Sequence, residues 1–186
     1  MLIICWIYIH GVNQLKALIL ISALFVQNAD IFTSVAAGDY DVTRKIFESN
    51  RFLVRAVNDK GETALHIAVK HGQIRILKYL LNEGFYVNAQ DGRLYTPIFT
   101  ACDTGDVNAA KILIQHGANV NAKGLGNTTP AHLAAYGGYC KMIILLHKNG
   151  ANMGAEDDKG ETPLMTAERT GRKDIVLYLR KSGIVK

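Results

Sequence analysis

The sequence predicts an all-α fold in which short pairs of antiparallel helices stack into a solenoid. The chain repeats itself with a period of 33 residues, and each repeat carries helix start and stop signals at fixed places. Between these signals, apolar residues recur at helical spacing. A composition of 49% hydrophobic and 20% charged residues with 3 prolines excludes a disordered or collagen-like chain.

Five positions recur across four copies of the repeat without a gap. One position is always threonine, one alanine and one leucine, and two are glycine. In chain order the columns are Thr63, Thr96, Thr129, Thr162; Ala68, Ala101, Ala134, Ala167; Gly72, Gly105, Gly138, Gly171; Leu80, Leu113, Leu146, Leu179; and Gly84, Gly117, Gly150, Gly183. Agreement of this extent excludes chance and indicates true structural repeats.

The first helix of each repeat is predicted to begin at the threonine. A proline follows Thr96, Thr129 and Thr162, and Thr-Pro combines a favoured N-cap with a favoured first helical residue. The helix then carries the constant alanine, whose small side chain lets a neighbouring helix approach closely. It is expected to end at the first glycine, which suits a left-handed C-terminal cap.

The second helix is predicted to follow that glycine. In the copy that begins near residue 58, its apolar residues are Ile74, Leu77, Leu80 and Leu81, which lie on one helical face. The helix ends at the second glycine, which starts the link to the next repeat. Because one helix pair cannot bury its apolar face alone, the pairs are expected to stack in one dimension.

The repeats also resemble a known family in their motifs. Residues 61–68 read GETALHIA, residues 117–122 read GANVNA, and residues 160–164 read GETPL. Together with the period, these segments resemble the ankyrin repeat and its T-P-L-H-x-A pattern. The resemblance covers residues 30–186 and implies an ankyrin-repeat solenoid with hairpin-like turns between the helix pairs.

The chain is therefore divided into two parts. Residues 1–29 form an N-terminal hydrophobic segment, and the resemblance implies that residues 30–186 form an ankyrin repeat domain. Its repeats are expected near residues 30–57, 58–90, 91–123, 124–156 and 157–186. The first repeat is degenerate, because Gly72 lies 34 residues after Gly38, which implies one inserted residue.

The N-terminal segment has three interpretations. A single charged residue, Lys16, precedes an apolar run over residues 17–26 and then Gln27, Asn28 and Ala29, which is typical of a signal peptide. Residues 2–26 are also long enough for a tilted membrane anchor, although polar residues near the middle count against it. The third interpretation is a degenerate helix that packs on the repeat domain. The sequence leaves all three open.

Two columns depart from the family pattern. The turn position held by Gly61 and Gly160 becomes Leu94 and Asn127. The family geometry implies a positive φ there, which leucine tolerates poorly, so the turn around Leu94 is expected to be distorted.

The second departing column holds His66 and His132, which become Phe99 and Met165. The resemblance implies that this histidine braces the turn through a hydrogen bond to the threonine. His66 and His132 are therefore expected to be structural.

No known catalytic or ligand-binding chemistry is recognised in the sequence. The three cysteines lack CxxC spacing, and no HExxH, GxSxG or phosphate-loop motif occurs. After Ala29, 20 Lys and Arg face 16 Asp and Glu without a run of like charges, so nucleic acid is not expected as a partner. Since the repeats occupy nearly all of the remaining chain, we expect no enzyme, no cofactor and no metal site.

The resemblance implies a protein-binding module whose contacts come from the concave face and the turn tips. Carried onto this sequence, the candidate partner-binding residues share an exposed place on a turn or at the end of a first helix. They are Lys60, Lys70, His71, Arg93, Tyr95, Asp103, Tyr136, Lys159 and Arg169. A protein partner and a monomeric chain are expected.

The alternative is an exported or membrane-tethered ankyrin effector that acts on proteins of another cell or compartment. Residues 1–29 support it, through possible membrane contact or export. Without such a role for this segment, a cytoplasmic location is expected.

Overall fold

A computed structural model describes residues 31–184 of the chain. The signal-peptide, anchor and packed-helix interpretations of residues 1–29 lie outside the described residues. Within residues 31–184, no helix is both long and apolar enough to cross a membrane.

The described chain is all-helical, as predicted. Residues 31–37 are helical, and α3 spans Tyr40–Ser49 and is followed by a 3-10 turn, η1, at Arg51–Arg55. The later helices are α4 (Ala64–Lys70), α5 (Ile74–Asn82), α6 (Pro97–Thr104), α7 (Val107–Gln115), α8 (Pro130–Gly137), α9 (Cys140–Lys148), α10 (Pro163–Arg169) and α11 (Lys173–Lys181). A 3-10 turn, η2, lies at Leu125–Asn127 in the loop before α8.

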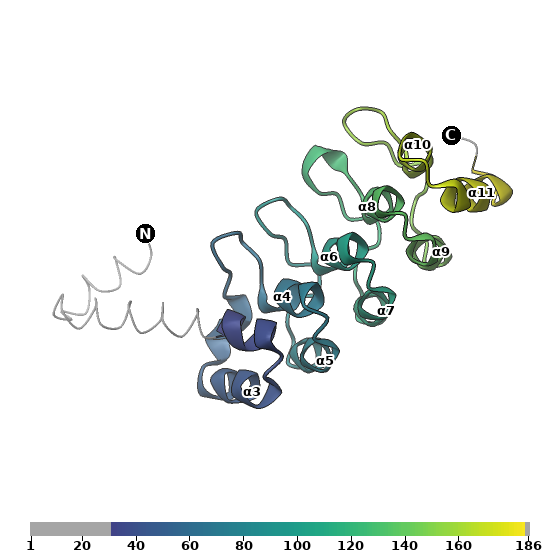
Figure 1. Cartoon of the computed structure of the whole chain (residues 1–186). Helices are drawn as coiled ribbons and strands as arrows, with labels where there is room; N and C mark the ends of the chain where they lie inside the picture. The colour runs from purple at the N-terminus through teal and green to yellow at the C-terminus, as the bar shows by residue number, and fades with distance from the viewer. Residues whose placement is uncertain (1–30, 185–186) are drawn as a thin grey trace, which may run out of the picture.

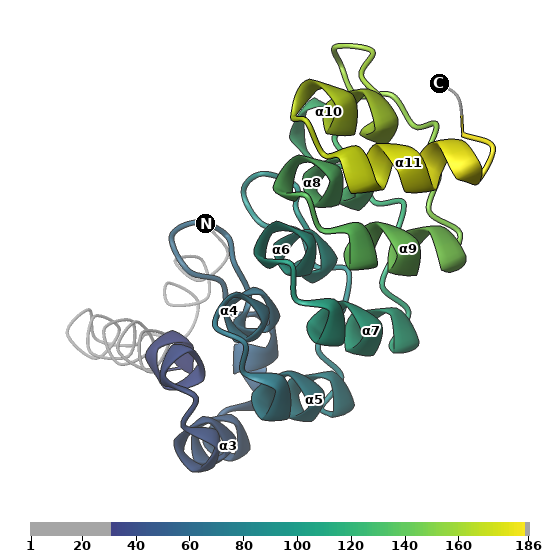
Figure 2. The same ribbon diagram turned by 45° about the vertical axis from the view of Figure 1, so that its right-hand side comes forward.

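The helices stack in two rows that form a solenoid (Figure 1). The inner row is α4, α6, α8 and α10, and each contacts the next. The outer row contains α3, α5, α7, α9 and α11, and long loops project beyond the inner row (Figures 1 and 2). Each inner helix also packs against the outer helix that follows it, from α4 with α5 to α10 with α11. The predicted stacking of helix pairs is therefore confirmed.

The repeated columns account for this packing. The alanine column, Ala68, Ala101, Ala134 and Ala167, is fully buried between inner helices, and the leucine column, Leu80, Leu113, Leu146 and Leu179, is fully buried beneath the outer row. Small side chains in the first column allow the inner helices to approach closely, while leucines fill the space between the rows. The chain therefore forms one continuous core rather than a separate core in each repeat.

The threonines begin the inner helices as predicted. Thr63 and Thr129 are N-caps of α4 and α8, and each takes part in a capping box with the histidine three residues later. Thr162 caps α10 by accepting a hydrogen bond from the backbone N–H of Met165. At the other end, Gly105 and Gly138 cap α6 and α8 with φ angles of 71° and 80°, a conformation that costs glycine little.

His66 and His132 join neighbouring repeats. His66 Nδ1 accepts a hydrogen bond from the Thr63 backbone N–H at 3.1 Å, so the ring hydrogen lies on Nε2, which donates to the Tyr95 carbonyl at 3.0 Å. His132 repeats this arrangement with Thr129 and the Glu161 carbonyl. Both histidines therefore tie the start of one inner helix to the loop of the next repeat, which supports the structural role expected for them.

The loops between repeats are connected through their backbones. Gly92 N–H donates to the Lys60 carbonyl, Leu125 N–H to the Arg93 carbonyl, and Asp158 N–H to the Gly126 carbonyl, each at 2.9 Å. We call the ends of these loops the hairpin tips and number them by their repeats: residues 58–62 are the second tip, 91–95 the third, 124–128 the fourth and 157–161 the fifth. Each tip is thus held by the one before it, so that the tips form a continuous row.

The expected positive φ at the variable turn position is confirmed, but the expected distortion of the tip is wrong. Leu94 has a φ of 61° and Asn127 of 55°, close to the 75° of Gly61. Leu94 N–H still donates to the Asp91 carbonyl at 2.9 Å, and Gly61 makes the equivalent bond to Asn58 at the same distance. Hydrogen bonds therefore preserve the turn, and the strain remains in the backbone of Leu94 itself.

Leu94→Gly is expected to raise the free energy of unfolding by about 1 kcal/mol, because glycine adopts a positive φ without strain. The measurement is denaturant unfolding of the full chain. Leu125→Gly is the matched control, since Leu125 is an exposed leucine on the next tip whose φ is not positive. A gain of equal size in both variants, or none in Leu94→Gly, would show that backbone strain is not released.

The buried His66 predicts a pH-dependent stability. Burial lowers the pKa of His66 below 6.5, its ordinary value, and a proton on Nδ1 would also oppose the Thr63 N–H. The neutral ring therefore stabilises the fold above about pH 6.5, and this contribution is lost as the pH falls through the lowered pKa. We expect the thermal midpoint to fall between about pH 7.5 and about pH 5.5. The fall in thermal midpoint should be smaller in His66→Gln and unchanged in the control His71→Gln. An equal dependence of the midpoint on pH in the unmodified chain and both variants would contradict this prediction.

Candidate partner-binding surface

The inner helices and the hairpin tips form one surface, which we call the inner face. It corresponds to the concave face predicted from the sequence. Its helices are short and packed into the core, and its tips are fixed by the bonds between them. Exposed side chains on this face are therefore carried by a rigid scaffold, which favours recognition of a partner without large rearrangement.

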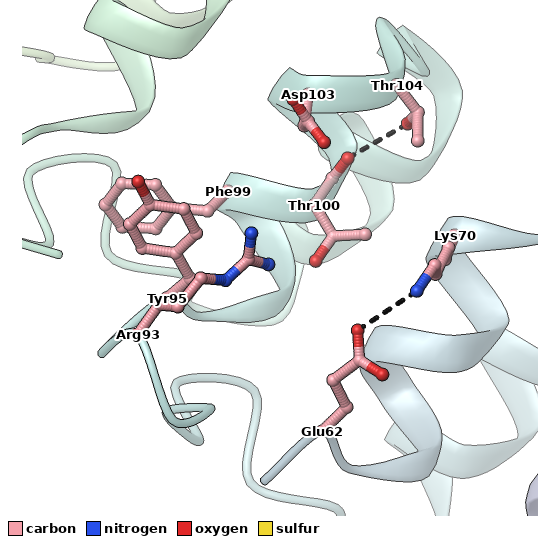
Figure 3. A pocket seen from close by; sticks show the side chains of 8 residues that line it. All are labelled: Glu62, Lys70, Arg93, Tyr95, Phe99, Thr100, Asp103 and Thr104. Atoms are coloured by element: carbon pink, nitrogen blue, oxygen red, sulfur yellow. Dashed lines mark hydrogen bonds and ion pairs between the residues drawn. The ribbon is translucent and has the colours of Figure 1, made fainter. Parts of the chain in front are cut away.

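The inner face is hollowed between α4 and α6. The hollow, which we call the side-chain pocket, has a volume of about 130 Å³. It is lined by Glu62, Lys70, Arg93, Tyr95, Phe99, Thr100, Asp103 and Thr104. Figure 3 shows Glu62 and Lys70 on one wall, with Tyr95 and Phe99 opposite. The pocket is smaller than the roughly 300–1,000 Å³ typical of small-molecule sites, so it suits one side chain.

On the first wall, Glu62 holds Lys70. The Glu62 carboxylate accepts from Lys70 Nζ at 3.3 Å and from Asn58 Nδ2 at 2.8 Å. Burial would raise the pKa of Glu62, but the hydrogen bonds from Asn58 and Lys70 and the positive charges of Lys70 and Lys60 outweigh it, so the pKa is lowered. Glu62 is consequently an ionised carboxylate at neutral pH, while the Lys70 side chain remains 43% exposed.

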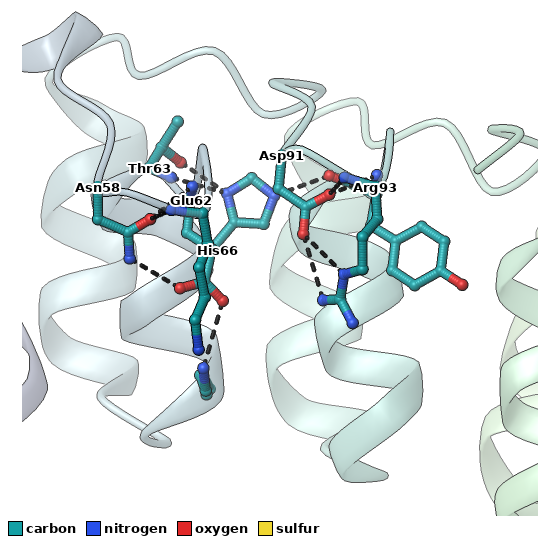
Figure 4. Close-up of polar contacts among 9 residues, drawn as sticks. Asn58, Glu62, Thr63, His66, Asp91 and Arg93 are labelled. Carbon is teal, nitrogen blue, oxygen red and sulfur yellow. Dashed lines mark hydrogen bonds and ion pairs between the residues drawn. The ribbon is translucent and has the colours of Figure 1, made fainter. Parts of the chain in front are cut away.

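Across the pocket from Glu62 and Lys70, Arg93 forms an ion pair with Asp91. Asp91 Oδ2 accepts from Arg93 Nε and Nη2 at 3.3 and 3.2 Å, and Asp91 Oδ1 accepts the backbone N–H groups of Arg93 and Tyr95 (Figure 4). The guanidinium also lies 4.6 Å from the centre of the Tyr95 ring, a favourable cation–π distance. The carboxylate is 2% exposed and the guanidinium side chain 59%. As with Lys70 and Glu62, the cation faces solvent and the acid is buried.

The wall of the pocket opposite Glu62 and Lys70 is formed by an aromatic stack. Tyr95 and Phe99 lie parallel, with ring centres 4.5 Å apart. Phe99 occupies the repeat position that His66 and His132 hold in their own repeats, and its side chain is fully buried. Because phenylalanine cannot accept or donate a hydrogen bond there, the buried Thr96 hydroxyl is without a hydrogen-bond partner among the described residues. The third repeat thus lacks the histidine link to the next repeat and instead carries an aromatic stack between two of its own residues.

Gly124 makes room for that stack. A Cβ atom built on Gly124 would lie 2.3 Å from Cε1 of Tyr95. The equivalent residues Asn58, Asp91 and Asp157 each accept backbone N–H groups of their own tip. The fourth tip therefore lacks the side chain that closes the other three.

The structure brings together four of the candidate residues predicted from the sequence. Lys70, Arg93, Tyr95 and Asp103 line the side-chain pocket, although Tyr95 is half-buried rather than fully exposed. Lys60 lies next to them, in an adjoining hollow of about 460 Å³ that it shares with Glu62, Lys70, Asp91 and Arg93. We call this second space the charged hollow.

The other four candidates lie elsewhere on the inner face. His71 is the exposed C-cap residue of α4, and Tyr136, on α8, is 60% exposed. Arg169 pairs with Glu161, with Nε at 2.9 Å from Oε1, and Lys159 is exposed on the fifth tip. These residues do not line the pocket or the charged hollow.

Sequence reasoning missed Asp91. The sequence analysis assigned no role to this residue, and its role in fixing Arg93 was not recognised. The available signal was the column of Asn58, Asp91 and Asp157, because short polar side chains at a turn accept nearby backbone N–H groups. Once that role is assigned, an arginine two residues later is in reach of the same carboxylate.

Among the described residues, no group of three or more His, Cys, Asp or Glu side chains is placed to hold a metal ion. Burial raises the pKa of the Cys102 thiol above its ordinary range, so this thiol stays protonated and unreactive at neutral pH.

Comparisons with known proteins agree with the repeat architecture. Residues 31–124 match a family model described as ankyrin repeats (3 copies), and residues 113–167 match a second described as ankyrin repeats (many copies). Palmitoyltransferase akr1 of Schizosaccharomyces pombe is 38% identical over 64 residues, which are 34% of this chain and 10% of that protein. Alpha-latrocrustotoxin-Lt1a of Latrodectus tredecimguttatus is 32% identical over 60 residues, which are 32% of this chain and 4% of the toxin. The chain thus spans a tenth or less of the length of these relatives.

Gly124→Ala is expected to lower the free energy of unfolding by about 1–3 kcal/mol, because the new methyl group would push Tyr95 out of its stack on Phe99. The measurement is denaturant unfolding of the full chain. Gly154→Ala is the matched control, because its Cβ would meet only Asn152 Oδ1, at 3.5 Å. Equal stability of the two variants would mean that the stack does not require the glycine.

Proposed function

Because the chain belongs to the ankyrin repeat family, we propose that it is a non-enzymatic module that binds a protein partner through its inner face and hairpin tips. Ankyrin repeats indicate a protein-protein interaction module. The family therefore supports the type of function, and the exposed side chains of the inner face support the proposed location.

One observation carries this location. Exposed cations and an aromatic side chain stand on the inner face in successive repeats, as Lys70 in the second, Arg93 in the third, Tyr136 in the fourth and Arg169 in the fifth. Arginine and tyrosine are enriched among the residues that dominate protein interfaces. Lys70, Tyr136 and Arg169 occupy the same position of their repeats, and Arg93 lies on the tip of the repeat between Lys70 and Tyr136. One partner surface can therefore contact several of them at once.

The backbone strain at Leu94 also supports the proposal that the inner face and its tips bind the partner. Its side chain is 47% exposed at the third tip, and Leu125 on the fourth tip is 67% exposed. A leucine at positive φ costs stability without burying its own side chain, and such local strain is found at functional sites. Contact with a partner would bury both leucines.

Catalysis is not proposed. The match to palmitoyltransferase akr1 covers only repeat residues and 10% of that protein, so the activity in its name is not transferred to this chain. Fold similarity by itself does not carry an activity.

A second candidate places the same module outside the cell that makes it, or on a membrane. The apolar run after Lys16 favours this exported or tethered effector. It differs from the first candidate in location and not in the binding mechanism, and if residues 1–29 have neither role the chain is expected to be cytoplasmic.

Partner capture tests the proposal. We expect the full chain to crosslink a protein from a cell lysate, and Lys70→Ala/Arg93→Ala/Tyr136→Ala to lose at least about tenfold of the captured amount, as expected for loss of interface anchors. Tyr95 is left intact because it packs on Phe99. Lys78→Ala/Lys111→Ala/Leu177→Ala, on exposed positions of α5, α7 and α11, is the matched control. Equal loss in both triple variants would contradict binding by the inner face.

A further inference from the structure

The charged hollow has an unusual lining. All five residues around it carry charge: Lys60, Glu62, Lys70, Asp91 and Arg93. Small-molecule sites are lined mainly by apolar side chains, so this composition points to a charged group of a macromolecule. The second and third hairpin tips and α4 supply the lining, and the elements themselves are fixed by the His66 and Gly92 hydrogen bonds.

The two signs of charge are separated by depth. The carboxylates of Glu62 and Asp91 are 8% and 2% exposed, whereas the side chains of Lys70 and Arg93 are 43% and 59% exposed. Lys60 is also exposed, and it forms no ion pair within residues 31–184. A molecule that approaches the hollow therefore meets cations first.

These cations retain donors for a ligand. Lys70 has three ammonium hydrogens, and Glu62 accepts one of them. Arg93 uses Nε and Nη2 on Asp91, and its Nη1 has no acceptor within the described part of the chain. The buried acids orient both cations. Binding of an acceptor therefore costs less side-chain entropy, because Lys70 and Arg93 are already partly ordered.

The balance of charge indicates the ligand. Three cations and two carboxylates leave a surplus of one positive charge in the charged hollow. A carboxylate carries one negative charge and matches this surplus, whereas a phosphoryl group carries about two at neutral pH. Asp103, on the far side of the side-chain pocket, is exposed and would repel an anion there. The anion is thereby directed to the side of Lys60, Lys70 and Arg93.

We infer that the charged hollow receives the carboxylate of an Asp or Glu side chain in a short acidic segment of the protein partner. This inference rests on the proposed function, because the inner face must be the binding surface. The carboxylate would accept hydrogen bonds from Lys70 Nζ and the Arg93 guanidinium, and Lys60 would add electrostatic attraction. The neighbouring side-chain pocket, with its volume of about 130 Å³, has room for one further side chain of the same segment.

A library of short random linear peptides, probed with the full chain, tests this inference. We expect the bound peptides to be enriched in Asp and Glu. Changing the critical acid of a bound peptide to its amide should weaken binding about tenfold, as should Lys70→Gln/Arg93→Gln in the protein, since two charge contacts are lost. Lys148→Gln/Lys181→Gln removes the same charge from exposed ends of α9 and α11 and should change binding less than about twofold.

Lys60→Gln tests the site independently, should the double variant fail to fold. It leaves the ion pairs of Glu62 and Asp91 intact, so the fold is retained, and we expect a loss of about twofold to threefold in binding of the acidic peptides. Thermal unfolding of each variant confirms that the proteins compared are folded.

The outcomes separate this inference from the proposed function. Bound peptides without acids that still depend on Lys70, Arg93 and Tyr136 would overturn the carboxylate site and leave the inner face as the binding surface. A preference of more than about tenfold for phosphoserine over glutamate at the same peptide position would reassign the site to phosphate. Equal losses in Lys70→Gln/Arg93→Gln and Lys148→Gln/Lys181→Gln, or no selected peptide, would overturn the inference. Peptide binding insensitive to every inner-face change would count against both.

Discussion

Close stacking of neighbouring helix pairs is the constraint on which the described chain depends. Ala68, Ala101, Ala134 and Ala167 are fully buried between inner helices, so each pair covers the apolar face of the next. The continuous core is built from contacts within each repeat and between neighbouring repeats, and stability is then nearly a sum of repeat and interface contributions. We call the contact between two neighbouring repeats a joint. A substitution at one joint is therefore expected to destabilise mainly the two repeats that form it.

The joint between the third and fourth repeats differs from those on either side. Phe99 replaces the bridging histidine, the Thr96 hydroxyl has no hydrogen-bond partner within residues 31–184, and Gly124 replaces the polar residue that closes the other tips. These changes belong together, because Tyr95 can stack on Phe99 only where residue 124 has no side chain. The stack forms one wall of the side-chain pocket, and its Tyr95 ring lies against the Arg93 guanidinium. A departure in a structural column has thus created part of the candidate binding surface.

The sequence was sufficient to predict the helix pairs, their caps and their stacking, because each depends on residues within one repeat or on a column with a constant side chain. The distortion expected at Leu94 was wrong, since the turn is held by a backbone bond to Asp91 that no composition reveals. The half-buried position of Tyr95 was also missed, because it depends on Phe99 and on Gly124, which lies 29 positions further along the chain. Local signals predicted elements well, and contacts between repeats required the structure.

The two buried acids of the inner face, Glu62 and Asp91, both stabilise the hairpin tips and position the exposed cations. Asn58 and Asp91 close their tips with side-chain oxygens, and Glu62 is held by Asn58. The same buried Glu62 and Asp91 carboxylates position Lys70 and Arg93. Replacing either acid would therefore weaken a hairpin tip and release a cation together, so loss of binding in such a variant could not separate recognition from folding. The exposed cations can change more freely, because surface charges contribute little to stability. In this arrangement the acids belong to the scaffold, and the cations are the part of the surface that can adapt to a partner.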